Sequence, residues 1–124
     1  MRNNILALCL LPSLVLAEPA GLAGLWQHSD QPVIVKMQAA GDGMEGIVHS
    51  YSDSPELVGE TLFRELRFDK EEQCWRGRVY VKELEQEKNT CLLLEDASQF
   101  RMAVTIGFFS KTVIWTRLEA EPSL

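Results

Sequence analysis

The chain has 124 residues, with 12 basic and 18 acidic side chains and a formal net charge of −6 at pH 7. This length suits one domain with a modest hydrophobic core. The acidic balance argues against nucleic acid and anionic membrane surfaces as partners, because both favour basic patches.

Residues 1–17 have the pattern of a secretory signal peptide, in which Arg2 precedes an apolar run over residues 5–16. At about 12 residues this run is shorter than the roughly 20 needed to cross a bilayer. No later stretch is apolar enough, so we expect no membrane span. Cleavage would leave residues 18–124, with 11 basic and 18 acidic residues and a net charge of −7. We expect this mature protein to be periplasmic or secreted.

Short runs in which apolar and polar residues alternate follow along the mature chain, separated by turn residues. Such alternation indicates strands with one buried face. Residues 61–68 also fit helical spacing, so a short helix competes with a strand there. In chain order, we expect strands over residues 22–27, 33–38, 44–49, 61–68, 75–81, 90–95, 100–106 and 112–118.

About eight short strands with no long helix between them predict an all-β fold, because parallel strands would need crossover connections. An antiparallel sandwich and an antiparallel barrel both fit this pattern. We favour a small up-and-down barrel over residues 18–124, since closure leaves no exposed strand edge.

Two cysteines, Cys74 and Cys91, remain after cleavage, and export would permit a disulfide. If Val81 pairs with Asn89, then Val79 lies opposite Cys91. Cys74 is then roughly 15 Å away and points to the other face, whereas a disulfide needs Cα atoms within about 7 Å. The sequence therefore predicts no bridge.

Six short segments lie in order along residues 23–118: Gly24-Leu25-Trp26, Val35-Lys36-Met37, Gly46-Ile47-Val48, Leu57-Val58-Gly59, Trp75-Arg76-Gly77-Arg78-Val79-Tyr80 and Trp115-Thr116-Arg117. In this order and spacing they resemble the uncharacterised bacterial family catalogued as domain of unknown function 2147. The resemblance implies an exported protein with a lipocalin-like β-barrel, and no settled activity comes with it. The chain departs from the family pattern at residues 81–88, where an Asp-Pro and Gly-Lys turn is missing, which puts any function of that turn in doubt.

Trp26 and Arg117 stand near the two ends of the predicted barrel. Lipocalins and their kin close the barrel with an arginine of the last strand over a tryptophan of the first, and such a contact contributes about 0.5–2 kcal/mol. We interpret the pair as structural; contact with a ligand is the alternative.

Several residues on the expected inward faces are either ordinary core or the lining of a cavity, because barrels of this size can be filled or can hold one small ligand. Small residues at Gly46 and Gly77 favour a cavity. The candidate cavity residues are Val33, Val35, Trp75, Val79, Phe100, Met102 and Val104.

Phe108 and Phe109 are adjacent aromatics in an expected turn, where they form a contact surface or fold back over the barrel mouth. The two histidines, His28 and His49, have no metal-ligand spacing, and we expect them in a solvated loop or at a strand edge. No cofactor site and no activated nucleophile or acid–base pair can be assembled, so we expect a protein that is not an enzyme. It would bind a small apolar ligand in its interior or, alternatively, bind a protein partner through its loops around a filled barrel.

Overall fold

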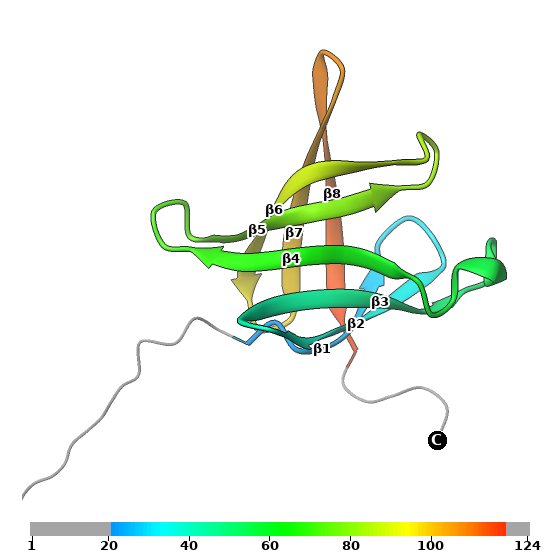
Figure 1. Cartoon of the computed structure of the whole chain (residues 1–124), viewed down its shortest axis with the longest axis horizontal. Coiled ribbons are helices and arrows are strands. Elements are labelled where there is room, and N and C mark those ends of the chain that lie inside the picture. Colours follow the sequence, from blue (N-terminus) through cyan, green and yellow to red (C-terminus); the bar gives the residue numbers. More distant parts are fainter. Residues whose placement is uncertain (1–20, 119–124) are drawn as a thin grey trace, which may run out of the picture.

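The computed structural model describes residues 21–118. These residues form a closed antiparallel β-barrel in which each strand pairs with the next and the last pairs with the first (Figure 1). The predicted all-β, up-and-down barrel is therefore confirmed. The predicted signal peptide, residues 1–17, lies outside the described residues. The elements are β1 (Gly24–His28), β2 (Val33–Ala40), β3 (Gly43–Tyr51), the 3-10 turn η2 (Pro55–Leu57), β4 (Thr61–Asp69), β5 (Cys74–Val81), β6 (Gln86–Asp96), β7 (Gln99–Ile106) and β8 (Phe109–Arg117).

Helical structure is almost absent from this arrangement. Over residues 21–118, no helix has the length and apolar character needed to cross a membrane.

The barrel closes where β1 meets β8. Trp26 lies opposite Arg117 in the register, and the guanidinium carbon of Arg117 is 4.3 Å from the centroid of the indole. The guanidinium also donates hydrogen bonds to the carbonyl oxygens of Ala97, Ala23 and Gly21, at 2.7, 2.6 and 2.7 Å. All of these contacts are with the protein itself, and they hold the end of β8 against β1, the residues before β1 and the turn between β6 and β7.

Aromatic side chains fill the barrel next to this closure. Trp26, Phe63 and Phe100 are each 0% exposed, and Trp115 is 1% exposed. Trp26 meets Phe100 edge to face with centroids 4.8 Å apart, and Phe63 meets Trp115 at 5.6 Å. Edge-to-face contacts of this kind stabilise the core beyond the area that they bury.

The fourth strand changes its inward face midway. Phe63 and Leu66 are both 0% exposed although they are three positions apart. The register with β5 shifts between Arg64 and Arg67, and Glu65 takes a positive φ of 60°. An extra residue of this kind is a β-bulge, which bends the strand and increases its twist. Residues 61–68 are thus a strand and not a helix, but the bulge breaks the simple alternation that the sequence analysis assumes.

The bulge also explains why two positions next to β4 are glycine. A Cβ atom on Gly77 would lie 2.8 Å from the carbonyl oxygen of Arg64, and one on Gly46 would lie 2.8 Å from the Phe63 ring. Both positions therefore allow β4 to pack closely against its neighbours. The expectation that these glycines leave room for a cavity is wrong, because Phe63 and Leu66 occupy the space.

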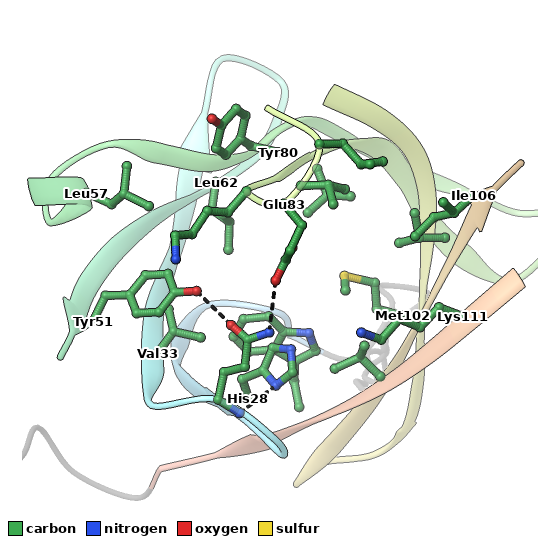
Figure 2. Close-up of a pocket in the computed structure, with 18 residues that line it drawn as sticks. His28, Val33, Tyr51, Leu57, Leu62, Tyr80, Glu83, Met102, Ile106 and Lys111 are labelled. Carbon is green, nitrogen blue, oxygen red and sulfur yellow. Dashed lines mark hydrogen bonds between the residues drawn. The ribbon is translucent and has the colours of Figure 1, made fainter. Parts of the chain in front are cut away.

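The opposite end of the barrel is open. The connections at this end are residues 29–32, 52–60, 82–85 and 107–108. They surround a pocket, which Figure 2 shows from close by. Gly21, Ala23 and Ala97, which bind Arg117, belong to the other end.

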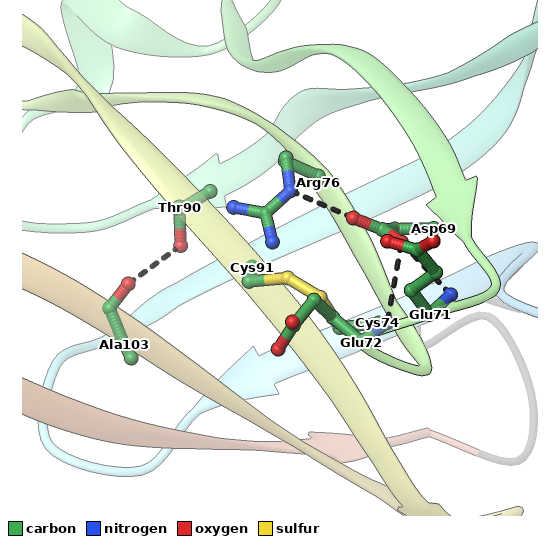
Figure 3. Close-up of a disulfide and its surroundings, with 8 residues drawn as sticks. All are labelled: Asp69, Glu71, Glu72, Cys74, Arg76, Thr90, Cys91 and Ala103. Atoms are coloured by element: carbon green, nitrogen blue, oxygen red, sulfur yellow. Dashed lines mark hydrogen bonds and ion pairs between the residues drawn. A yellow bond between two sulfur atoms is a disulfide. The ribbon is translucent and has the colours of Figure 1, made fainter.

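Cys74 and Cys91 form a disulfide with Cα atoms 5.6 Å apart, so the prediction of no bridge is wrong (Figure 3). Val81 pairs with Gln86 and not with Asn89, and Arg76 therefore lies opposite Cys91. The register differs from the expected one by three residues, and an odd shift moves side chains to the other face of a sheet. Both cysteines consequently share the outer face and lie diagonally across two strands.

The reason for this register is the short connection between β5 and β6. Glu85 takes a positive φ of 52° and closes the turn, so that the polar residues 86–89 form strand instead of loop. Glu87 then lies between two arginines of the outer face, 2.6 Å from Arg64 Nε and 3.6 Å from Arg78 Nη2. At the start of β6, charge pairs on the outer face thus replace the alternation of apolar and polar residues that marks the other strands.

Candidate functional site

The open end of the barrel holds a cavity of about 230 Å³ that opens to solvent (Figure 2). Its walls are mostly aliphatic side chains from five strands and from η2, and its rim carries polar and charged groups. The lining residues are His28, Gln31, Val33, Tyr51, Leu57, Leu62, Val79, Tyr80, Val81, Lys82, Glu83, Leu84, Met102, Val104, Ile106, Lys111, Val113 and Trp115.

Four of the seven candidate cavity residues line this pocket: Val33, Val79, Met102 and Val104. The other three, Val35, Trp75 and Phe100, do not belong to its lining.

Those three residues pack elsewhere. Val35 and Phe100 are 0% exposed and belong to the filled part of the core. Trp75 is half-buried and packs edge to face on Phe68, with centroids 5.5 Å apart. Strand parity identifies inward-facing residues, but it does not tell which end of the barrel each of them reaches.

Polar side chains link three rim segments. The hydroxyl of Tyr51, at the end of β3, donates to Oε1 of Gln31 at 2.6 Å, and Nε2 of Gln31 donates to Glu83 at 3.5 Å. Burial, followed by the nearby carboxylates of Glu83 and Asp53, raises the pKa of Tyr51 above its ordinary value. Tyr51 is therefore a neutral donor at neutral pH, and it ties β3 to the loop that precedes β2.

His28 stands at the end of β1, beside the pocket floor (Figure 2). Its Nδ1 accepts hydrogen bonds from the backbone amides of Asp30 and Gln31, at 2.9 and 3.2 Å. An accepting Nδ1 carries no proton, so the neutral ring has its proton on Nε2. Burial lowers the pKa of His28, and Lys111 adds to this effect against the opposing charges of Asp30 and Glu83.

The neighbour of His28 on the floor is Trp115, 4.9 Å away between ring centroids. Trp115 is 1% exposed, and its indole N–H has no hydrogen-bond partner among residues 21–118. Buried polar groups nearly always have a partner, so this unpaired donor is unusual.

Phe108 and Phe109 lie at the tip of the hairpin between β7 and β8, which projects beyond the rest of the barrel (Figure 1). Phe108 is 107% exposed and Phe109 is 64% exposed. The two rings therefore point into solvent and do not fold back over the mouth.

The polar groups of the pocket were missed by the sequence analysis, which places His28 in a solvated loop or at a strand edge and assigns no role to Lys111. The available signal was the alternation of side chains along a strand, which predicts which residues point into the barrel. His28 shares the parity of Trp26 in β1, and Lys111 shares that of Val113 and Trp115 in β8. Gln31 and Glu83 lie in loops, where no parity exists to find them.

Within residues 21–118, no three His, Cys, Asp or Glu side chains gather in a way that could hold a metal ion.

Comparison with protein-family models, with curated protein sequences and with solved structures finds no match for this chain. The resemblance to the domain of unknown function 2147 therefore stays a prediction.

Proposed function

We propose that this protein is an exported, non-catalytic β-barrel that binds a small, largely apolar ligand in the pocket at its open end. The observation that carries this proposal is the apolar cavity of about 230 Å³ beside a fully packed aromatic core. A folded barrel does not need such a space, because protein interiors otherwise pack as tightly as organic crystals.

The size of the cavity limits the ligand. Pockets for drug-sized ligands have volumes of about 300–1,000 Å³, whereas an apolar cavity of about 150 Å³ is enough for benzene. The pocket thus suits a short aliphatic chain or a single ring system with one polar end. Burial of this apolar surface would supply roughly 25 cal/mol per Å².

The disulfide supports export. Disulfides persist in oxidising compartments such as the periplasm and the extracellular space, and are rare in the cytosol. The Cys74–Cys91 bridge on the outer face agrees with the predicted signal peptide over residues 1–17. Together they favour a periplasmic or secreted protein, as does the family resemblance.

Titration with the fluorescent probe N-phenyl-1-naphthylamine would test binding in the pocket. Val104 is 3% exposed and lines the cavity, so Val104→Phe should fill part of it and weaken binding by about ten-fold or more. Ala103 is its neighbour on the outer face, and Ala103→Phe should leave binding unchanged. Equal binding by both variants, or no binding by the unaltered protein, would contradict the proposal. Native mass spectrometry of protein taken from the periplasm would then identify a co-purifying ligand.

A second candidate function is binding of a protein partner through the loops. The fully exposed Phe108 favours it, because aromatic side chains are enriched where proteins meet. The double variant Phe108→Ser, Phe109→Ser should then remove a stoichiometric partner from the native mass spectrum without changing binding of the probe. Retention of the partner by this variant would reject the role of the hairpin tip.

A further inference from the structure

We infer that the ligand of this pocket carries an anionic head group, a carboxylate in the simplest case, held between Lys111 and His28. The inference rests on the proposed function and specifies the chemical class of the ligand: a small amphipathic acid, with its apolar part against the aliphatic walls and its charge between His28 and Lys111.

Lys111 provides the positive charge. It lies on β8 with the inward parity of Val113, and Figure 2 shows its side chain extending from the strand into the pocket. Among residues 21–118, Lys111 takes part in no ion pair within 4.0 Å. Lys111 is exposed to solvent beside the pocket, and a cation in this place without a protein partner favours an anion that arrives with the ligand.

His28 provides a directed donor. Because its Nδ1 already accepts two backbone amides, the remaining nitrogen, Nε2, bears the proton, and it has no hydrogen-bond partner among residues 21–118. The two amide contacts also fix the orientation of the ring, so that little freedom is lost when a ligand binds. The neutral, pre-oriented N–H of His28 can donate to one oxygen of a carboxylate, while the ammonium group of Lys111 binds the other.

The ring of Trp115 lies beside His28 in the lining of the pocket. Its unpaired indole N–H belongs to a side chain that lines the pocket and contacts His28 edge to face. A buried donor without a partner costs about 1–3 kcal/mol. This N–H is closed off from the pocket, so the ring offers the ligand apolar surface beside His28 and not a third donor.

Glu83 is the one anionic side chain of the lining, and it opposes an anionic ligand. Its carboxylate faces Gln31, whose Nε2 is 3.5 Å away, on the side of the rim that carries Tyr51. Lys82 and Lys111 outnumber it in the lining, although the whole chain has a net charge of −6. The pocket is therefore more positive than the protein that surrounds it.

Calorimetric titration with octanoate and with 1-octanol at neutral pH would test this inference, because the two probes share a chain and differ at the head group. Octanoate should bind about ten-fold more tightly, since hydrogen bonds to a charged group are stronger than those to a neutral one. Lys111→Gln should remove most of this preference and leave the affinity for 1-octanol within about two-fold of the original value. Lys36 is exposed on β2 and is absent from the pocket lining, so Lys36→Gln makes the same change in charge and should keep the preference.

The outcomes separate the inference from the proposed function. Equal affinity for the two probes, or a preference that survives Lys111→Gln, overturns the anionic head group and leaves an apolar-ligand pocket standing. A preference lost equally in Lys36→Gln overturns the local role of Lys111. Failure of both probes to bind overturns the inference and the proposed function together.

Discussion

His28 and Trp115 meet edge to face at the floor of the open pocket, with ring centroids 4.9 Å apart. The contact joins the end of β1 to a residue near the end of β8, and these two strands close the barrel. Burial lowers the pKa of His28, and this ring packs on one of the two closing strands, so pH should act on the closure as well as on the pocket.

The first prediction concerns this pH dependence. Burial lowers the pKa of His28 from 6.5 in the folded protein, with Lys111 adding to the effect. The unfolded chain therefore binds more protons as the pH falls through 6.5, and the stability contributed by the neutral ring is complete above that value and lost below it. Thermal unfolding followed by circular dichroism from about pH 8 to about pH 5 should show this loss.

The control is His28→Asn, because the amide oxygen of asparagine can still accept the two backbone amides but does not titrate. This variant should have a flatter dependence of Tm on pH over the same range. A dependence identical to that of the unaltered protein would show that another group is responsible.

The second prediction concerns the closure. Arg117→Ala removes a cation from the face of Trp26 and three hydrogen bonds to backbone carbonyls. The expected loss is about 2–3 kcal/mol, which lowers Tm by roughly 8–20 °C in a domain of this size. Arg101→Ala, which removes only a surface ion pair with Glu95, should cost less than about 1 kcal/mol. Similar effects of the two variants would show that the ends of the barrel are not held by Arg117.

The third prediction concerns the disulfide. A bridge that closes a loop over a sequence separation of 17 restricts the unfolded chain, and reduction should cost about 3 kcal/mol. Purified protein should show no reactive thiol from Cys74 or Cys91 until it is denatured and reduced. The double variant Cys74→Ser, Cys91→Ser should have the Tm of the reduced protein and should not respond to dithiothreitol. Two free thiols in the folded, unreduced protein would contradict the structure.

The fourth prediction concerns the bulge in β4. Gly77→Ala places a Cβ atom 2.8 Å from the carbonyl oxygen of Arg64 and 2.9 Å from that of Glu65, and the backbone cannot yield as a flexible side chain can. We expect a loss of about 1–3 kcal/mol in chemical unfolding. Gly21→Ala is the matched control, because nothing lies within 4 Å of the added atom. An unchanged midpoint for Gly77→Ala would mean that β4 and β5 are further apart than the structure shows.

The sequence was sufficient for the parts of the fold that obey simple alternation. In residues 33–38 and 100–106 every second residue is a large apolar one, and both segments are strands with the expected buried faces. Alternation fails where a single residue takes a positive φ, as Glu65 and Glu85 do, because one such residue changes the face or the register of all that follow. The missed disulfide and the misjudged glycines both trace to these two residues.

The candidate site could be predicted only as far as its walls. Val79 and Met102 follow from strand parity, whereas Gln31 and Glu83 lie in loops whose course depends on tertiary contacts. Whether the barrel is filled depends on how the rings of Phe63 and Phe100 pack, which no pattern in the chain encodes. The result is a barrel packed at one end and hollow at the other.

The three carbonyl groups that hold Arg117 place Gly21 and the end of β8 on the packed side of the barrel, away from the mouth. If the protein were attached to a surface through Gly21 or through the end of β8, the open end of the barrel would face the solution. Immobilised protein should therefore capture small molecules as readily as free protein does, which makes the fold convenient for screening chemical libraries on a sensor chip.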